Sequence, residues 1–251
     1  MAITRQSNVT FNKWHEFRLA INELIASGVY KSLVDIHADM ERDPDGFNRT
    51  RHRMHGSMYG PIGFRRFLGW HRAFLIAFER ELRKENEHLS IPYWDWDNDN
   101  GRLIGIKNII GLSTGRSLGR LPDESDDGSG RPTWFSSTEQ TKALEELEGD
   151  YYVFSRFLES EPHNAGHDWI GGDMGNPMIS PNDPIFWMHH AQIDRIWSEW
   201  QTRNPGEKPF LDSDERRLDP WDDEFDIDSI DDISNLGDDS YSYEPPVRPT
   251  P

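Results

Sequence analysis

Hydrophobic side chains recur every three or four residues in three stretches of the chain, residues 14–25, 30–40 and 67–82. This spacing places them on one face of an α-helix, and the third stretch fits a single face best. A fourth strong helix is expected over about residues 184–201, and a short one over residues 161–172, where proline suits the first turn and glycine the end. The pattern predicts a mainly α protein, a helical bundle whose core can host a cofactor between facing helices.

Two other stretches show no comparable periodicity. Residues 101–131 hold seven of the twenty glycines and are predicted to form a long surface loop. Residues 211–240 hold thirteen Asp or Glu side chains against two Arg, and this acidic segment is expected to wrap the surface rather than form a domain. The predicted organisation is one domain over residues 1–243, followed by a short tail over residues 244–251.

Composition narrows the class of protein. Ten Trp, thirteen Phe and seven Tyr exclude a disordered acidic chain despite the formal net charge of -18. The acidic balance disfavours nucleic acid and anionic membranes as partners, since phosphate contacts need clustered Lys and Arg. Without a long apolar run or a signal-peptide pattern, a cytoplasmic location is the default expectation, and export with a partner that carries the signal is the alternative. No cysteine is present, so His, Asp or Glu must bind any metal.

Two histidines in the C-terminal half have a spacing that suits a metal ion. His163 and His167 lie four residues apart and share one helical face. A third ligand is expected from His189 or His190 on the next helix. Such a pair alone is weak evidence for a metal. A zinc peptidase is disfavoured because Asn164 stands where that class has its general-base Glu.

The N-terminal half supplies a second group of histidines. His37 and His71 lie on inward helical faces, with His52 and His55 between them in sequence. A single buried histidine is more often a hydrogen-bonded core residue than a ligand. Two groups that can each supply three imidazoles favour a pair of metal sites instead. Imidazole binds copper, zinc, iron and nickel, and copper is favoured on affinity.

Three longer motifs resemble a known family. Residues 67–72, FLGWHR, resemble the motif FLPWHR, and residues 91–96, IPYWDW, contain the motif PYWDW. Residues 180–190, SPNDPIFWMHH, begin a third motif, which continues through Asp194 and Trp197. Over roughly residues 5–243 the chain is similar to the tyrosinases, catechol oxidases and hemocyanins, which are type-3 copper proteins. The resemblance implies a helical bundle with a dicopper site between its core helices.

The resemblance also implies which histidines bind the two copper ions. His163, His167 and His190 correspond to the ligands of copper B, and His189 is then a neighbour of the site. His37 and His71 correspond to two of the copper-A ligands.

The middle copper-A ligand departs from the family pattern. The family has this histidine nine residues before the motif histidine, where Ile62 stands in this chain, so an insertion must separate ligand and helix. His55, followed by Gly56 as in the family's HG pair, is the expected ligand, and His52 is the alternative. Gly69 in place of the motif's proline is a second departure, and we do not expect it to affect copper binding.

Three polar residues correspond to family positions near the substrate. Asn164 and Glu159 match the residues that hold a water which deprotonates the phenol, although each also suits a helix cap or a surface charge. Asp168 occupies a position that faces the substrate. A carboxylate there predicts a preference for cationic phenols such as tyramine or dopamine over acidic ones.

Two positions further from the substrate also have expected roles. Asp194 follows His190 by one turn, where a carboxylate can orient a ligand ring, and a salt bridge with Arg195 or Arg72 is the alternative. The segment 241–243 resembles the YxY motif that closes the catalytic domain in this group and is expected to pack on Arg5 by cation-π contact. The chain stops eight residues later, so we expect no additional domain to cover the site.

The function implied by the resemblance is oxidation of phenols by dioxygen at two copper ions. This reaction comprises ortho-hydroxylation of monophenols and oxidation of o-diphenols to o-quinones. The alternatives are a catechol oxidase with diphenolase activity only, a hemocyanin-like oxygen-binding protein, and a protein that has lost copper A. Expected partners are small phenols and a copper-delivery chaperone.

Overall fold

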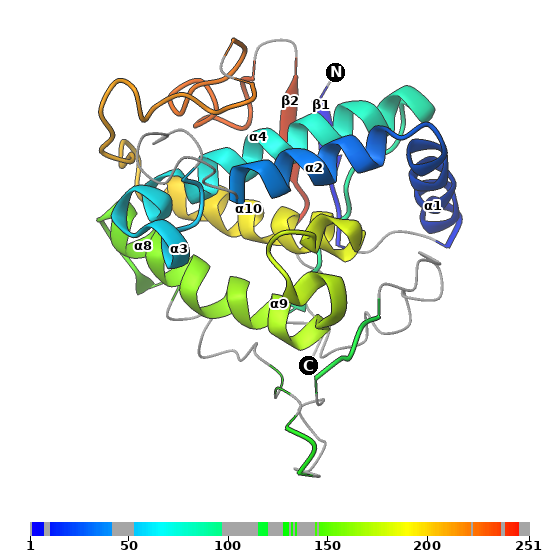
Figure 1. Cartoon of the computed structure of the whole chain (residues 1–251). Helices are drawn as coiled ribbons and strands as arrows, with labels where there is room; N and C mark the ends of the chain where they lie inside the picture. The colour runs from blue at the N-terminus through cyan, green and yellow to red at the C-terminus, as the bar shows by residue number, and fades with distance from the viewer. Residues whose placement is uncertain are drawn as a thin grey trace, which may run out of the picture.

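The computed structural model describes residues 2–7, 11–41, 53–96, 115–119, 128–130, 132, 134, 144, 146–221, 223–236 and 239–245, without the side chains at 11, 12 and 41. Most of the predicted loop 101–131, the alternative ligand His52 and most of the predicted tail 244–251 lie outside these residues. Figure 1 shows the arrangement of the elements. In chain order they are β1 (Ala2–Arg5), α1 (Phe11–Ala26), α2 (Val29–Glu41), α3 (Gly56–Tyr59), α4 (Pro61–Glu85), α8 (Tyr151–Leu158), the π-helical turn η3 (Glu159–His163), α9 (Asn164–Ile170), the 3₁₀ turns η4 (Gly172–Gly175) and η5 (Ser180–Asn182), α10 (Ile185–Arg203) and β2 (Ser240–Tyr243).

The predicted mainly α fold is confirmed. The three periodic stretches form α1, α2 and α4, and the fourth expected helix forms α10. The long helix α4 packs against α1, α8 and α10 (Figure 1). The stripe on α1 ends at the buried Leu24, because Ile25 is 40 % exposed. Among the described residues, no helix has the length and apolar character needed to cross a membrane.

The helical segment before His167 differs from the prediction. It begins at α8, ten residues earlier than expected, where the Asp150 side chain accepts hydrogen bonds from the backbone N–H groups of Tyr152 and Val153. Pro162, expected in the first turn of a helix, lies instead inside η3. A wider π-helical turn can accommodate proline because proline offers no N–H for an α-helical hydrogen bond.

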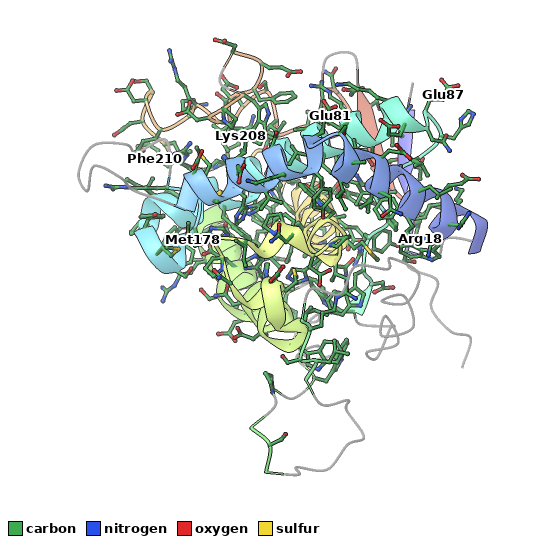
Figure 2. All side chains as sticks on the ribbon, turned by 45° about the vertical axis from the view of Figure 1, so that its right-hand side comes forward. Arg18, Glu81, Glu87, Met178, Lys208 and Phe210 are labelled. Carbon is green, nitrogen blue, oxygen red and sulfur yellow. The ribbon has the colours of Figure 1, made fainter. Side chains whose placement is uncertain are left out.

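The acidic segment covers the outer side of α4 (Figure 1). It contributes buried side chains to the core, among them Leu218, Ile227 and Ile230. A Cβ atom at Gly69 of α4 would lie 2.1 Å from Cδ1 of Ile227. The glycine that replaces the family's proline therefore provides the space in which this segment packs. Just before the segment, Phe210 projects into solvent (Figure 2).

A buried ionic network joins the two ends of the chain to the central helices. β1 and β2 pair in parallel, with Arg5 opposite Tyr243. The guanidinium of Arg5 donates to both carboxylate oxygens of Glu79 on α4, at 3.3 and 2.9 Å, and to Asp194 on α10 at 3.1 Å. It also lies 4.9 and 5.5 Å from the ring centroids of Tyr241 and Tyr243, the predicted cation-π contacts. The network thus fixes α10 against α4.

We expect Arg5→Ala to lower the free energy of unfolding by about 3–5 kcal/mol, because it leaves the fully buried carboxylate of Glu79 without its cation. Urea unfolding followed by circular dichroism measures this change. The matched control is Lys31→Ala, which breaks the exposed pair with Asp35 and should cost about 0.5 kcal/mol or less. A loss below about 1 kcal/mol for Arg5→Ala would show that the network contributes little to stability.

Candidate metal centre

One group of three buried histidines comes from α2, α3 and α4. His37 lies on α2, His55 immediately precedes α3 and His71 lies on α4, and their ligand atoms all lie within 4.8 Å of one another. Nδ1 of His71 donates to the Phe67 carbonyl oxygen at 2.8 Å, and Nε2 of His71 has no partner. Neither ring nitrogen of His37 forms a hydrogen bond, since the nearby Pro177 carbonyl does not reach hydrogen-bond geometry. Buried imidazole nitrogens without partners are suited to bind a metal ion.

The single turn α3 provides the insertion expected between His55 and α4. Gly60 connects the two helices with a φ of 67°, a conformation that favours glycine. A Cβ atom at Gly63 would lie 2.2 Å from the carbonyl oxygen of His55, so only glycine permits this close approach of the backbone to α4. These two glycines allow His55 to reach the cluster from a loop rather than from a long helix.

The second group comes from η3, α9 and α10. Nε2 of His167 lies 3.1 Å from Nε2 of His163 and 3.3 Å from Nε2 of His190. Nδ1 of His167 donates to the Met174 carbonyl at 2.8 Å, and Nδ1 of His163 lies 3.0 Å from Oδ1 of Asn164. With each Nδ1 acting as the donor, the Nε2 lone pairs of His163 and His167 face each other. This arrangement is favourable only when a cation or a proton lies between them.

His189 competes with His190 for the third place. Its ring, together with His163 and His167, also offers three atoms within 4.8 Å of one another. However, Nε2 of His189 lies 3.0 Å from the carbonyl oxygen of His163 and donates to it, which leaves only Nδ1. Gly166 gives this ring its space, since a Cβ atom there would lie 2.3 Å from Cε1 of His189. The geometry favours His190 as the ligand and gives His189 a supporting position.

The two groups face each other in an apolar environment. The rings of His71 and His190 stack with centroids 4.3 Å apart and an interplanar angle of 12°. Phe186 packs on His190 at 4.1 Å, and Phe67 packs on His163 at 4.7 Å. The histidines are therefore shielded from water on this side.

Burial keeps the imidazoles neutral. Desolvation, followed by the other histidines, lowers the pKa of His37, His71, His163 and His190 well below the ordinary value of 6.5. The pKa of His167 falls to about 4 for the same first reason. Neutral imidazoles are the form that binds metal, and a set of nitrogen donors without thiolate suits copper. The residues present therefore fit two copper ions.

Both groups open onto one cavity of about 270 Å³. Its volume is near the lower end of the range for small-molecule pockets, about 300–1,000 Å³. The lining residues come from both halves of the site and include two methionines: His37, His55, Ser57, Met58, His163, Asn164, His167, Asp168, Met174, Gly175, Pro177 and Ser180. Ser57, Met58 and Met174 were not predicted from the sequence, because no local pattern distinguishes them from ordinary helix and loop residues.

Asp194 does not have its expected role. Its carboxylate accepts from Arg72 at 2.6 Å, from Arg5 at 3.1 Å and from the Tyr243 hydroxyl at 2.5 Å. Nδ1 of His190, the ring it was expected to orient, has no partner. The alternative bridge to Arg72 is the correct one, because two buried guanidinium groups compete successfully for this carboxylate.

The other three polar residues have distinct positions. Asn164 and Asp168 line the cavity, and Asp168 is exposed. Glu159 is fully buried and is not among the lining residues. Its carboxylate accepts hydrogen bonds from the backbone N–H groups of Gly56 and Ser57, both at 3.0 Å, and from the Ser57 hydroxyl at 3.1 Å.

Comparisons with known proteins agree with this geometry. The family model described as the common central domain of tyrosinase matches residues 27–120 and 119–203. A tyrosinase from Streptomyces glaucescens is 31 % identical over 90 % of this chain and 94 % of its own length. A tyrosinase from Streptomyces antibioticus is 30 % identical over 82 % of this chain and 84 % of its own.

Solved structures show the same fold. A functional unit of octopus hemocyanin superposes with a TM-score of 0.65 at 22 % identity, covering 98 % of this chain and 68 % of that chain. A polyphenol oxidase from Grenache grape, Vitis vinifera, superposes with a TM-score of 0.60 at 21 % identity, covering 97 % and 85 %. The family match, the Streptomyces relatives and the two facing histidine groups show that this chain belongs to the tyrosinase family of type-3 copper enzymes.

Proposed function

We propose that the enzyme both hydroxylates monophenols and oxidises o-diphenols to o-quinones. The observation that supports this proposal best is the single cavity onto which both histidine groups open. A phenol in this cavity can reach both metal positions, whereas an oxygen carrier must keep phenols out. Bound copper would supply dioxygen binding and the redox chemistry.

Within this proposal, six histidines hold the two ions. His37, His55 and His71 form the copper-A set, and His163, His167 and His190 form the copper-B set. Three neutral imidazoles per ion leave coordination positions open for exchangeable ligands. The protein fixes the direction of three of the lone pairs through the Nδ1 contacts of His71, His163 and His167. It also contributes the apolar shield of Phe67 and Phe186.

The two candidates for the third copper-B ligand can be separated by substitution. We expect His190→Ala to bind one copper per chain and His189→Ala to bind two, measured by atomic absorption after dialysis. His189→Ala removes the hydrogen bond to the His163 carbonyl and the packing of a buried ring against His163 and His167, but no ligand of this set, so its copper B should be weakened but retained. The reverse result, with one copper lost only in His189→Ala, would assign the site to His163, His167 and His189.

Asn164 is suited to assist hydroxylation of monophenols. Its Oδ1 fixes the His163 ring, which leaves the Nδ2 amide group to orient a water or the incoming phenol at the cavity wall. Oxidation of an o-diphenol places fewer demands on such a group, because it needs no hydroxylation step.

We expect Asn164→Asp to lower the rate on tyramine about 100-fold while changing the rate on dopamine less than about 10-fold. The carboxylate keeps the acceptor for His163 but removes the Nδ2 donor. Initial rates of quinone formation at full copper occupancy measure the effect. An equal loss on both substrates would indicate that Asn164 serves the copper site alone, and no monophenol activity in the unchanged enzyme would identify a catechol oxidase.

Asp168 places a negative charge at the entrance of the cavity. An exposed carboxylate about 4 Å from a bound ammonium group is worth about 1 kcal/mol, or about fivefold in binding. We therefore propose that cationic phenols such as tyramine and dopamine are preferred over carboxylated ones.

Asp168→Asn should reduce kcat/KM for tyramine about fivefold relative to 3-(4-hydroxyphenyl)propionate. Because Asp168 is exposed, the preference of the unchanged enzyme should also shrink as salt rises. Asp173→Asn, a nearby charge that does not line the cavity, is the control. Equal kcat/KM values for both substrate classes in the unchanged enzyme would remove this proposal.

A further inference from the structure

Glu159 connects the two halves of the metal centre. It is the first residue of η3, and His163 is the last residue of the same turn. Its fully buried carboxylate reaches across to α3, where Oε2 accepts from the N–H of Gly56 and Oε1 accepts from the N–H and the hydroxyl of Ser57. These residues directly follow His55, so one side chain of the copper-B segment holds the copper-A loop.

The turn α3 depends on this contact. A helix leaves its first N–H groups without partners, and a side chain at the N-cap usually accepts them. The N-cap of α3 is His55, which provides no such acceptor. A helix of four residues is also too short to be stable by itself. The Glu159 carboxylate therefore supplies the acceptor that α3 lacks, and its negative charge is favourable at a helix N-terminus.

We propose that Glu159 is a positioning residue that holds His55 in its place in the first metal site and sets the spacing between the two sites. The ring centroids of His55 and His163 lie 5.8 Å apart, with an interplanar angle of 25°. Glu159 is linked to His163 through the turn η3 and to His55 through its hydrogen bond with Gly56. This inference rests on the proposed assignment of His55 as a copper ligand. It differs from a water-holding role, which requires carboxylate oxygens facing the cavity rather than the α3 backbone.

Glu159→Gln tests the proposal with little change in volume. The amide NH₂ meets backbone N–H donors, so at least one of the three hydrogen bonds is lost. We expect one of the two copper ions to bind about tenfold more weakly or worse, while the other keeps its affinity. Copper affinity is measured for each variant by titration against a competing chelator, with circular dichroism and urea unfolding of the copper-free protein in parallel.

The controls identify the site that changes. Glu161→Gln, an exposed residue in the same turn, should keep both affinities. Ser57→Ala removes one of the three bonds and should weaken the same single site by a smaller factor. His55→Ala should lose one copper, which identifies the site that weakens in Glu159→Gln. If His55→Ala retains both ions, the assignment of His55 as a ligand is wrong, and the result does not bear on the role of Glu159.

Three outcomes would overturn the proposal. Two unchanged copper affinities with loss of monophenol turnover alone would assign Glu159 the water-holding role. Equal weakening of both sites together with lower resistance to urea would indicate a general contribution to stability. Unchanged affinity and turnover in Glu159→Gln would show that the contact with α3 has no role at the site.

Discussion

Convergence of neutral imidazole nitrogens in a dry interior is the constraint on which this structure depends. Lone pairs that face each other at 3.1 Å, as in His163 and His167, repel unless a cation lies between them. Burial prevents the rings from relieving this repulsion by protonation, because it lowers the pKa of each of them. The surrounding helices must therefore hold the rings in place when no metal is bound.

Two separate sets of contacts meet this demand. One turn beyond His190, the carboxylate of Asp194 is bound by Arg5 and Arg72, so α10 cannot slide along α4. Such a network costs desolvation energy, and its value lies in fixing one arrangement of charged groups. On the cavity side, Glu159 binds the backbone of α3. The contacts of Asp194 align α10 with α4, and the contacts of Glu159 position the loop that carries His55.

The sequence predicted the helices and the histidines because both have local signatures. A stripe of period 3.6 identifies α4, and the four-residue spacing of His163 and His167 places both rings on one helical face. The π-helical turn was missed because Pro162 has the same local appearance at the start of an α-helix as inside a wider turn. The resemblance named Glu159 as a functional residue, but its partner lies 103 residues away and has no local signature.

The packing around Gly69 illustrates how distant contacts also alter the meaning of a motif. From the sequence, the replacement of the proline of FLPWHR by Gly69 was not expected to affect copper binding. In the structure, Ile227 of the acidic segment occupies the space that a side chain at position 69 would need. Isoleucines of that segment enter the core, and two of its acidic side chains, Glu224 and Asp239, form salt bridges with Arg80 of α4. The acidic segment, whose composition is typical of a solvent-exposed surface, thus covers the outer side of α4, the helix that carries His71. The metal centre is consequently enclosed on the α4 side and accessible from the cavity, which Asn164 and Asp168 line.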